Sequence, residues 1–287
     1  MKNKNLISVL VVLISIISIL ATSTGIFSAG GPGNYEYETI RGEGIAIYGT
    51  GLYKHMSADV AIQGIAQDYI TLFIGVPLLL ISLFFARKSS LRGLFVLSGT
   101  LLYFFLTYLF YTAMAMYNEM FLAYVFLLGV SFYTLILTLF SFDLEKVTSS
   151  IISNKIFKPA GLFLIINASL IALLWLSVVV PPLINGTIFP KEVQHYTTLI
   201  VQGFDLGLFL PAAFITGYLA IKKNQFGLLF TPTYLIFLSI LMIALVSKII
   251  FMANAGANVI PVVFIMPTIA LTSIIFSFLI LKNFRHH

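Results

Sequence analysis

The sequence predicts an all-α membrane protein of eight transmembrane helices, arranged as two parallel four-helix repeats with a small β-containing extracytoplasmic cap. Of its 287 residues, 60% are hydrophobic and only 9% are charged. The charges fall between eight apolar runs, each near the ~20 residues that cross a ~30 Å hydrocarbon layer as a helix. Because lipid offers no partner to backbone N–H and C=O groups, such runs are helical. The runs are 6–28, 69–86, 93–115, 120–142, 159–180, 198–221, 228–252 and 259–281.

The basic residues predict the orientation of the chain. Lys and Arg in short loops stay on the cytoplasmic side of a membrane. With the N-terminus inside, twelve of the 16 basic residues fall in inner segments, whereas most acidic residues fall in outer ones. The prediction is a cell-membrane protein with both termini in the cytoplasm and the lipid bilayer as its partner. The net charge of +6 then reflects topology, and no nucleic acid is expected to bind.

Both chain ends leave alternatives open. Residues 2–29 form either a retained span or a cleaved signal peptide, since Lys2 and Lys4 precede an apolar stretch that ends near Ser28. The stretch is long for a signal peptide, which favours a retained span. At the other end, His286 and His287 are either native residues or the remnant of a purification tag.

The longest polar segment, residues 29–67, is predicted to form the outer cap. Its stretch from Tyr35 to Tyr53 alternates aromatic or β-branched residues with polar ones and contains four glycines. That pattern is typical of short strands joined by tight turns. Residues 57–67 are expected to form a short amphipathic helix capped by Ser57. The second outer loop, residues 181–197, is rich in proline and is expected to be irregular.

An internal repeat is visible when the chain is shifted by 134 residues. The shift aligns Pro77 with Pro211, Gly93 with Gly227, and five other identical pairs within 28 ungapped positions. Each copy holds four spans, an even number, so both copies cross the membrane in the same direction. The predicted domains are a first half at 1–142 that includes the cap, a cytoplasmic linker at 143–158 and a second half at 159–287.

A series of landmarks extends from residue 35 to residue 255. The landmarks are Gly51-Leu52-Tyr53, Gln67-Asp68, Pro77-Leu78-Leu79, Ser90-Leu91-Arg92-Gly93, Tyr117-Asn118, Trp175-Leu176 and Asp205-Leu206. Their order resembles a family of uncharacterised prokaryotic polytopic membrane proteins, and this resemblance implies no activity. In architecture, one span, a β-rich outer segment and three further spans also resemble the claudin-like four-helix membrane proteins. The paired cysteines of that group are missing here, so this resemblance concerns the fold and not the function.

Charged residues inside the apolar runs are the first candidates for function, because each is costly in lipid unless it is paired or hydrated. Asp205 lies in the sixth run and Lys248 in the seventh, and Gln202 lies one turn before Asp205 on the same face. A functional interpretation makes Asp205 a cation or proton site with Lys248 as its counter-charge. A structural interpretation is a static ion pair, which the reach of the lysine side chain allows, or a lysine that extends to the interface.

A second group of polar residues is predicted to line an outward-facing cup closed by the cap. Its members are Gln63, Gln67, Asp68, Tyr108, Tyr111, Asn118 and Glu119. The alternative is that the tyrosines belong to an aromatic belt at the membrane interface and the acids cap helix N-termini. Asp68 in particular is expected to open the second span.

Two prolines, Pro77 and Pro211, lie inside incoming spans at repeat-related positions. Each removes a backbone hydrogen bond and is expected to bend its helix. Helices interrupted at matched positions are a pointer to a transport site, although proline kinks are also common in membrane helices.

The sequence also excludes several kinds of chemistry. There is no cysteine, which excludes disulfides, thiolate metal sites and thiol catalysis. No predicted span contains a histidine to ligate a haem between helices. The chain has no Walker loop, GxSxG, HExxH or run of acids spaced for two metals. These absences predict a non-enzymatic protein without a cofactor or a metal site.

Two functions remain after these exclusions. The first is a permease or channel-like protein for a small solute or ion, using the cup between the halves. The alternative is a membrane-anchored binding or assembly protein whose cap engages a protein partner or lipid. A hydrated polar path that reaches the middle of the membrane distinguishes the first function from the second.

Overall fold

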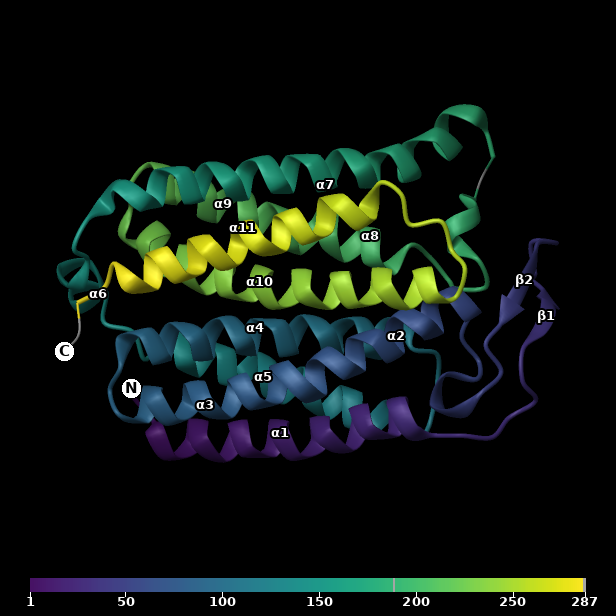
Figure 1. The fold of residues 1–287 in the computed structure, drawn as a ribbon, viewed down its shortest axis with the longest axis horizontal. Coiled ribbons are helices and arrows are strands. Elements are labelled where there is room, and N and C mark those ends of the chain that lie inside the picture. The colour runs from purple at the N-terminus through teal and green to yellow at the C-terminus, as the bar shows by residue number, and fades with distance from the viewer. Residues whose placement is uncertain (188, 286–287) are drawn as a thin grey trace.

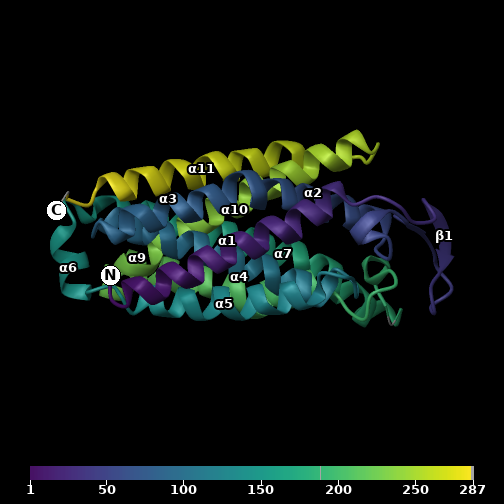
Figure 2. The same cartoon turned by 90° about the horizontal axis from the view of Figure 1, so that it is seen from below.

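The computed structural model describes residues 1–187 and 189–285, so the two terminal histidines lie outside the described residues. Its helices run side by side along the long axis of the molecule (Figure 1). The N-terminus, the C-terminal end and the short helix α6 (Leu144–Ser150) gather at one end, called here the terminal end. The strands β1 (Tyr35–Glu38) and β2 (Gly44–Ile47) lie at the opposite end, the strand end, and Figure 2 shows β1 extending beyond the helices.

Eight helical stretches of the described chain are long and apolar enough to cross a membrane. In chain order they are α1 (Lys4–Phe27); α2 (Ala58–Ile70) continuing through η2 (Thr71–Gly75) into α3 (Val76–Arg87); α4 (Leu91–Met114); α5 (Phe121–Leu139); α7 (Phe157–Asn185); α8 (Ile200–Phe204) continuing through η5 (Asp205–Phe209) into α9 (Leu210–Ile221); α10 (Gln225–Asn254); and α11 (Val262–Lys282). Large apolar side chains on them face outward; Leu122 is 78% exposed and Phe264 71%. The predicted number and type of spans is therefore confirmed, and the surface is compatible with an integral membrane protein.

The eight stretches pack as two groups of four. Helices α1, α3, α4 and α5 contact one another in a ring, as do α7, α9, α10 and α11, and Figure 1 shows the two groups one above the other. Glycines permit close helix crossings inside a group. A Cβ built on Gly161 of α7, for example, would lie 2.5 Å from the carbonyl oxygen of Gly217 on α9.

The two halves meet along α10, which packs against α2 and α4. A Cβ on Gly99 of α4 would lie 2.7 Å from Ile236 Cβ on α10. Next to this contact the hydroxyl groups of Ser98 and Thr233 are 2.9 Å apart. The halves are therefore joined by a tight contact in which small residues bring the two backbones together.

The cap confirms the predicted strands. β1 and β2 are antiparallel, with Tyr35 opposite Ile47 and Glu38 opposite Gly44. Gly49 has a φ of 70°, and a Cβ there would lie 1.7 Å from the carbonyl oxygen of Gly33, so this turn requires glycine.

The boundary between cap and second span differs from the prediction. The helix that starts after Ser57 does not end at residue 67; it continues without a break from Ala58 to Arg87. The cap therefore ends at residue 57, and the second span starts eleven residues before the predicted residue 69. No proline separates the two parts, so the helical hydrogen bonds continue through them. As a result Asp68 is the eleventh residue of α2 and does not open a helix.

The second long loop is also shorter than predicted. Helix α7 continues through Pro181 and Pro182 to Asn185, although neither proline has an N–H group to donate within the helix. In the described part of the segment that follows, residues 186–187 and 189–199, the short 3-10 helix η4 (Lys191–Val193) is the one element before α8. The predicted linker at 143–158 contains α6, whose N-terminus is capped by the Asp143 carboxylate accepting from the backbone N–H groups of residues 145 and 146.

The predicted proline irregularities take the form of π-helical turns. η2 starts at Thr71 and η5 at Asp205, again 134 residues apart, and Pro77 and Pro211 are each the second residue of the α-helix that follows. The wider π-helical turn accommodates a proline ring that would otherwise clash with the carbonyl four residues earlier.

Candidate functional site: a cavity between the halves

A cavity of about 290 Å³ lies where the two halves meet, between α2 and α4 on one side and α7, η5 and α10 on the other. Most of its wall is apolar. Its polar residues come from both halves and are Tyr53, Gln63, Gln67, Thr107, Tyr111, Asn167, Trp175, Asp205, Tyr234 and Lys248. The cavity therefore brings both charged residues predicted inside the spans, and three members of the predicted cup, to one space.

Asp205 enters the cavity wall from the first position of η5. Trp175 of α7 donates its indole N–H to Asp205 Oδ2 over 2.8 Å. Gln202, which was predicted to share this site, is half-buried on α8 and is not among the residues that line the cavity. The Asp205 backbone N–H donates to Val201 O and Gln202 O, so the helix is continuous between the two residues, and the helical spacing alone does not bring Gln202 to the cavity.

Lys248 lines the same cavity but does not form the predicted ion pair. Among the described residues, the ion pairs within 4.0 Å are Lys54–Glu119 and Lys146–Asp143. Lys248 interacts electrostatically with Asp205 and Asp68 at longer range. Trp175 already donates to the Asp205 carboxylate.

Asp68 is fully buried and lies behind the cavity wall. Tyr53 donates its hydroxyl to Oδ2 over 2.6 Å, and Tyr111 donates to Oδ1 over 2.9 Å. Burial first, and then the Asp68 charge, raises the pKa of Tyr53 well above its usual value, so this hydroxyl remains a donor. Two hydrogen bonds to a carboxylate are a strong stabilising arrangement in a dry interior. The prediction that Asp68 caps a helix N-terminus is therefore wrong.

Helix α1 makes room for this carboxylate. A Cβ built on Gly25 would lie 1.9 Å from Asp68 Oδ2 and 2.8 Å from the Tyr53 hydroxyl. The rings of Tyr53, Tyr108, Tyr111 and Tyr124 contact one another around the same point. Tyr108 is thus part of a buried tyrosine cluster and not of an open cup.

Gln67 connects the cavity to the π-helical turn η2. Its amide donates to Tyr103 Oη over 2.8 Å and to Thr107 Oγ1 over 3.2 Å. The Tyr103 hydroxyl in turn lies 2.8 Å from Thr71 Oγ1, at the start of η2. The amide oxygen of Gln67 is buried and has no hydrogen-bond partner among the described residues. The same is true of Asn167 Oδ1 across the cavity.

The remaining members of the predicted cup do not share one space. Gln63 lines the cavity. Asn118 caps the turn before α5, accepting from Met120 N over 2.9 Å. Glu119 is exposed and pairs with Lys54 at 3.1 Å. A hydrogen bond from its own backbone N–H and the Lys54 ammonium lower the pKa of Glu119. The members of the predicted cup are therefore divided among the cavity wall, the buried tyrosine cluster, the turn before α5 and the surface.

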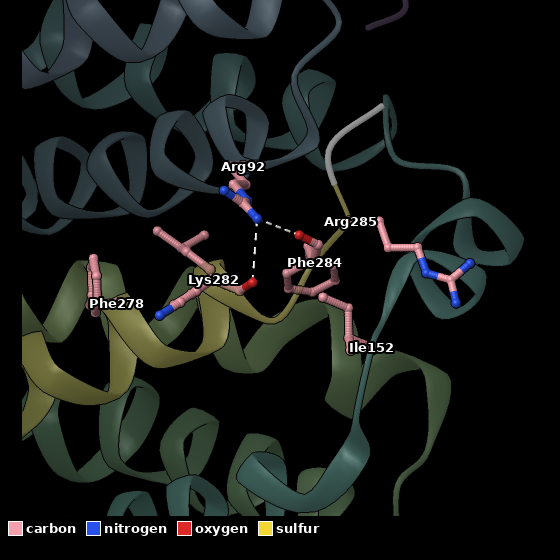
Figure 3. Close-up of a pocket in the computed structure, with 7 residues that line it drawn as sticks. Arg92, Ile152, Phe278, Lys282, Phe284 and Arg285 are labelled. Atoms are coloured by element: carbon pink, nitrogen blue, oxygen red, sulfur yellow. Dashed lines mark hydrogen bonds between the residues drawn. The ribbon is translucent and has the colours of Figure 1, made fainter.

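A larger surface pocket, of about 890 Å³, lies at the terminal end (Figure 3). Arg92 of α4 donates there to the backbone carbonyls of Lys282 and Phe284. Figure 3 shows Arg92 directed at these carbonyls and Arg285 directed away from them. A cation at the carbonyl end of a helix stabilises that helix. The hydrogen bonds of Arg92 also connect the end of α11 to the first half.

Trp175, Asn167, Tyr53 and Gly25 are site residues that the sequence did not identify. Asn167, a polar residue inside an apolar run, was a usable signal. Trp175 was a landmark of the resemblance only, and nothing in the sequence placed it beside Asp205.

Comparison with known proteins adds nothing to this geometry. No family model matches the chain, and no curated protein and no solved structure matches it. The resemblances to a prokaryotic membrane protein family and to claudin-like proteins remain predictions.

Proposed function

We propose that this protein is a non-enzymatic permease or channel-like protein for a small solute or ion. The observation that carries the proposal is the cavity between the halves, which reaches both Asp205 and Lys248. Uncompensated charge within a span costs several kcal/mol, and intramembrane charge typically marks a substrate or ion path. A protein whose spans served only as an anchor has no need for an acid, a base and two unpaired amide oxygens around one internal space.

We further propose that the two halves are copies of one four-span unit. The turn between α3 and α4 and the turn between α9 and α10 support this. In the first, Ser89 N and Ser90 N donate to Ala86 O and Phe85 O. In the second, Lys223 N and Asn224 N donate to Ala220 O and Leu219 O, the same bonds at a shift of 134 residues. In both turns the helix ends in a Schellman motif, with Ser89 or Lys223 in the left-handed backbone conformation. A site at the interface of two repeats is the usual place for transport.

The proposed location is the cell membrane, with the terminal end in the cytoplasm. Basic side chains support this orientation, because Arg87 ends α3, Lys88 follows it in the loop to α4, and the loop that joins α9 to α10 contains Lys222 and Lys223. The acid-rich cap at the strand end then faces outward.

A cavity-filling substitution tests the proposed function. Leu245 lines the cavity, and Leu245→Trp would fill much of it. Leu271→Trp is the matched control, because Leu271 is 60% exposed on α11 and faces away from the cavity. Both variants and the wild type are reconstituted in liposomes and assayed for flux of amino acids, amines, monocarboxylates, sugars, Na⁺, K⁺ and protons.

We expect at least one of these to move faster than through protein-free liposomes. That flux should be lost in Leu245→Trp and retained in Leu271→Trp. Absence of flux for the whole panel, or equal flux in both variants, would exclude transport through the cavity.

The second candidate function is a membrane-anchored binding or assembly protein. It is supported by Ile40, which is 91% exposed in the turn between β1 and β2. An apolar side chain at the tip of a projecting hairpin suits a contact with a protein partner or lipid. If Ile40→Asp abolishes the cellular role of the protein while flux is absent from the wild type, this second function replaces the first.

A further inference from the structure

The cavity contains two opposite charges that do not neutralise each other directly. Asp205 and Lys248 both line it, and no ion pair within 4.0 Å joins them. Trp175 occupies Asp205 Oδ2. Among the described residues, Asp205 Oδ1 and Lys248 Nζ have no hydrogen-bond partner. A molecule inside the cavity thus meets a free carboxylate oxygen and a free ammonium group.

Two further groups in the wall also lack partners. Gln67 is 3% exposed and Asn167 is 7% exposed, and the amide oxygen of each is buried without a hydrogen bond among the described residues. Gln67 is held in place by its own bonds to Tyr103 and Thr107. A buried acceptor without a donor costs about 1–3 kcal/mol, so both oxygens favour a ligand that brings N–H groups.

Asp68 does not add its charge to the cavity surface. Its two oxygens accept from Tyr53 and Tyr111, and these two side chains, not Asp68 itself, line the cavity. The exposed chemistry is therefore one carboxylate and one ammonium, which matches a ligand with one positive and one negative group.

The size and walls of the cavity narrow the ligand class. A volume of about 290 Å³ holds roughly ten water molecules at ~30 Å³ each. That is room for one amino acid with a medium-sized side chain, and it lies at the lower end of the ~300–1,000 Å³ of ordinary ligand pockets. Apolar side chains such as Phe110, Leu241 and Met266 complete the wall.

We propose that the cavity binds a small zwitterion, an α-amino acid with an apolar side chain, with its ammonium at Asp205 and its carboxylate at Lys248. Gln67 and Asn167 accept the remaining N–H groups, and the apolar wall receives the side chain. This inference rests on the proposed function, because it names the substrate class of the same cavity.

The single tryptophan of the chain provides the measurement. Trp175 is bonded to Asp205 at the cavity wall, so its fluorescence reports occupancy of the site. The purified protein in lipid nanodiscs is titrated with L-leucine, with 4-methylpentanoate, which lacks the ammonium group, and with 3-methylbutylamine, which lacks the carboxylate. We expect leucine to bind about 10- to 100-fold more tightly than either analogue, the effect of one lost charged hydrogen bond.

Two variants assign the groups. Asp205→Asn should reduce leucine binding to the level of 4-methylpentanoate and leave the affinity for 4-methylpentanoate unchanged. Lys248→Met should reduce leucine binding to the level of 3-methylbutylamine and leave that amine's affinity unchanged. The unchanged affinity for one analogue shows that each variant is folded. Equilibrium dialysis with labelled leucine replaces fluorescence where a substitution alters Trp175 directly.

Several results would overturn the inference. Equal affinities of the wild type for leucine and 3-methylbutylamine would make the cavity a cation site. Equal affinities for leucine and 4-methylpentanoate would make it an anion site. Binding of none of the three probes would exclude a zwitterion of this size. In each case the proposed function stands if another solute shows a flux that Leu245→Trp removes, and falls if none does.

Discussion

Gly25 of α1 lies directly against the carboxylate of Asp68 on α2. A Cβ at position 25 would be 1.9 Å from Asp68 Oδ2, inside any permitted contact distance. The absence of a side chain on one span is thus what allows the carboxyl group of Asp68 to be buried on the next. The same carboxylate orients Tyr53 and Tyr111, and these two residues form part of the cavity wall.

We therefore expect Gly25→Ala to destabilise the protein strongly. The new methyl group must displace the carboxylate from its hydroxyl donors, so overpacking and the loss of a charged hydrogen bond combine to about 3 kcal/mol or more. Gly129→Ala on α5 is the control, because a Cβ there would meet nothing within 4 Å. Thermal unfolding in detergent measures both. Similar melting temperatures for the two variants would contradict the close contact.

The hydroxyl of Tyr111 should contribute to stability separately. It donates to Asp68 Oδ1 and lies 2.8 Å from Gly64 O. Tyr111→Phe removes these bonds and should lower the free energy of unfolding by about 1–3 kcal/mol, the cost of leaving a buried acceptor without its donor. Tyr133→Phe, at a tyrosine that is 63% exposed, should have little effect. Chemical unfolding of the two variants in mixed micelles would show whether the buried bond is stabilising.

The proposed duplication predicts equal effects at Gly93 and Gly227. A Cβ on Gly93 would lie 2.6 Å from Phe85 Cβ, and one on Gly227 would lie 2.2 Å from the carbonyl carbon of Leu219, which is the residue equivalent to Phe85. Each alanine pushes apart the two helices of its turn, so we expect a comparable loss of about 1–3 kcal/mol in both variants. Gly203→Ala, with nothing within 4 Å, is the control. A large effect at only one of the two positions would show that the turns are not equivalent in packing.

The sequence predicted the number of spans, the strands of the cap and the irregularities near Pro77 and Pro211, because each depends on local pattern. The length of an apolar run predicts a span. Alternation of aromatic or β-branched residues with polar ones, interrupted by glycines, predicts a hairpin. The start of the second span was misplaced because hydropathy falls in the polar turns of α2, although the helix itself continues from Ala58.

The site was only partly predictable for a different reason. Which side chain meets Asp205 depends on how α7 and η5 are rotated against each other, and no periodicity in one helix reports this. The predicted partner was Lys248, because it is the basic residue that lies inside an apolar run. The observed donor to Asp205 is instead the indole N–H of Trp175. The role of Gly25 is equally non-local, since a glycine is informative only once its neighbour across the helix interface is known.

Accessibility of introduced cysteines tests the proposed orientation, and the cysteine-free chain provides a clean background. Ile40→Cys places a thiol at the strand end, and Ile152→Cys places one at the terminal end; the native side chains are 91% and 61% exposed. A membrane-impermeant maleimide should label the first in intact cells and the second only after permeabilisation. The reverse pattern would invert the protein in the membrane.

The docking of the second loop onto the cap should depend on pH through His195. Nε2 donates to the His55 carbonyl over 3.0 Å, whereas Nδ1 is buried without a partner among the described residues. Burial lowers the pKa of His195 below its usual 6.5, because a second proton would occupy the unpaired Nδ1. The docked state therefore binds fewer protons than the undocked state. Its stability is fully present above pH 6.5 and decreases as the pH falls from there to the lowered pKa.

Hydrogen exchange of residues 191–198, corrected for the intrinsic pH dependence of exchange, measures this effect. We expect protection at pH 7.5 and a loss of protection at pH 5.5 in the wild type. His195→Gln removes the titrating group and should make protection independent of pH over this window. His55→Gln retains the backbone carbonyl that accepts from His195 and should preserve the wild-type response. If His195→Gln keeps the full pH dependence, another group at the strand end controls the docking, and the buried Nδ1 is not the cause.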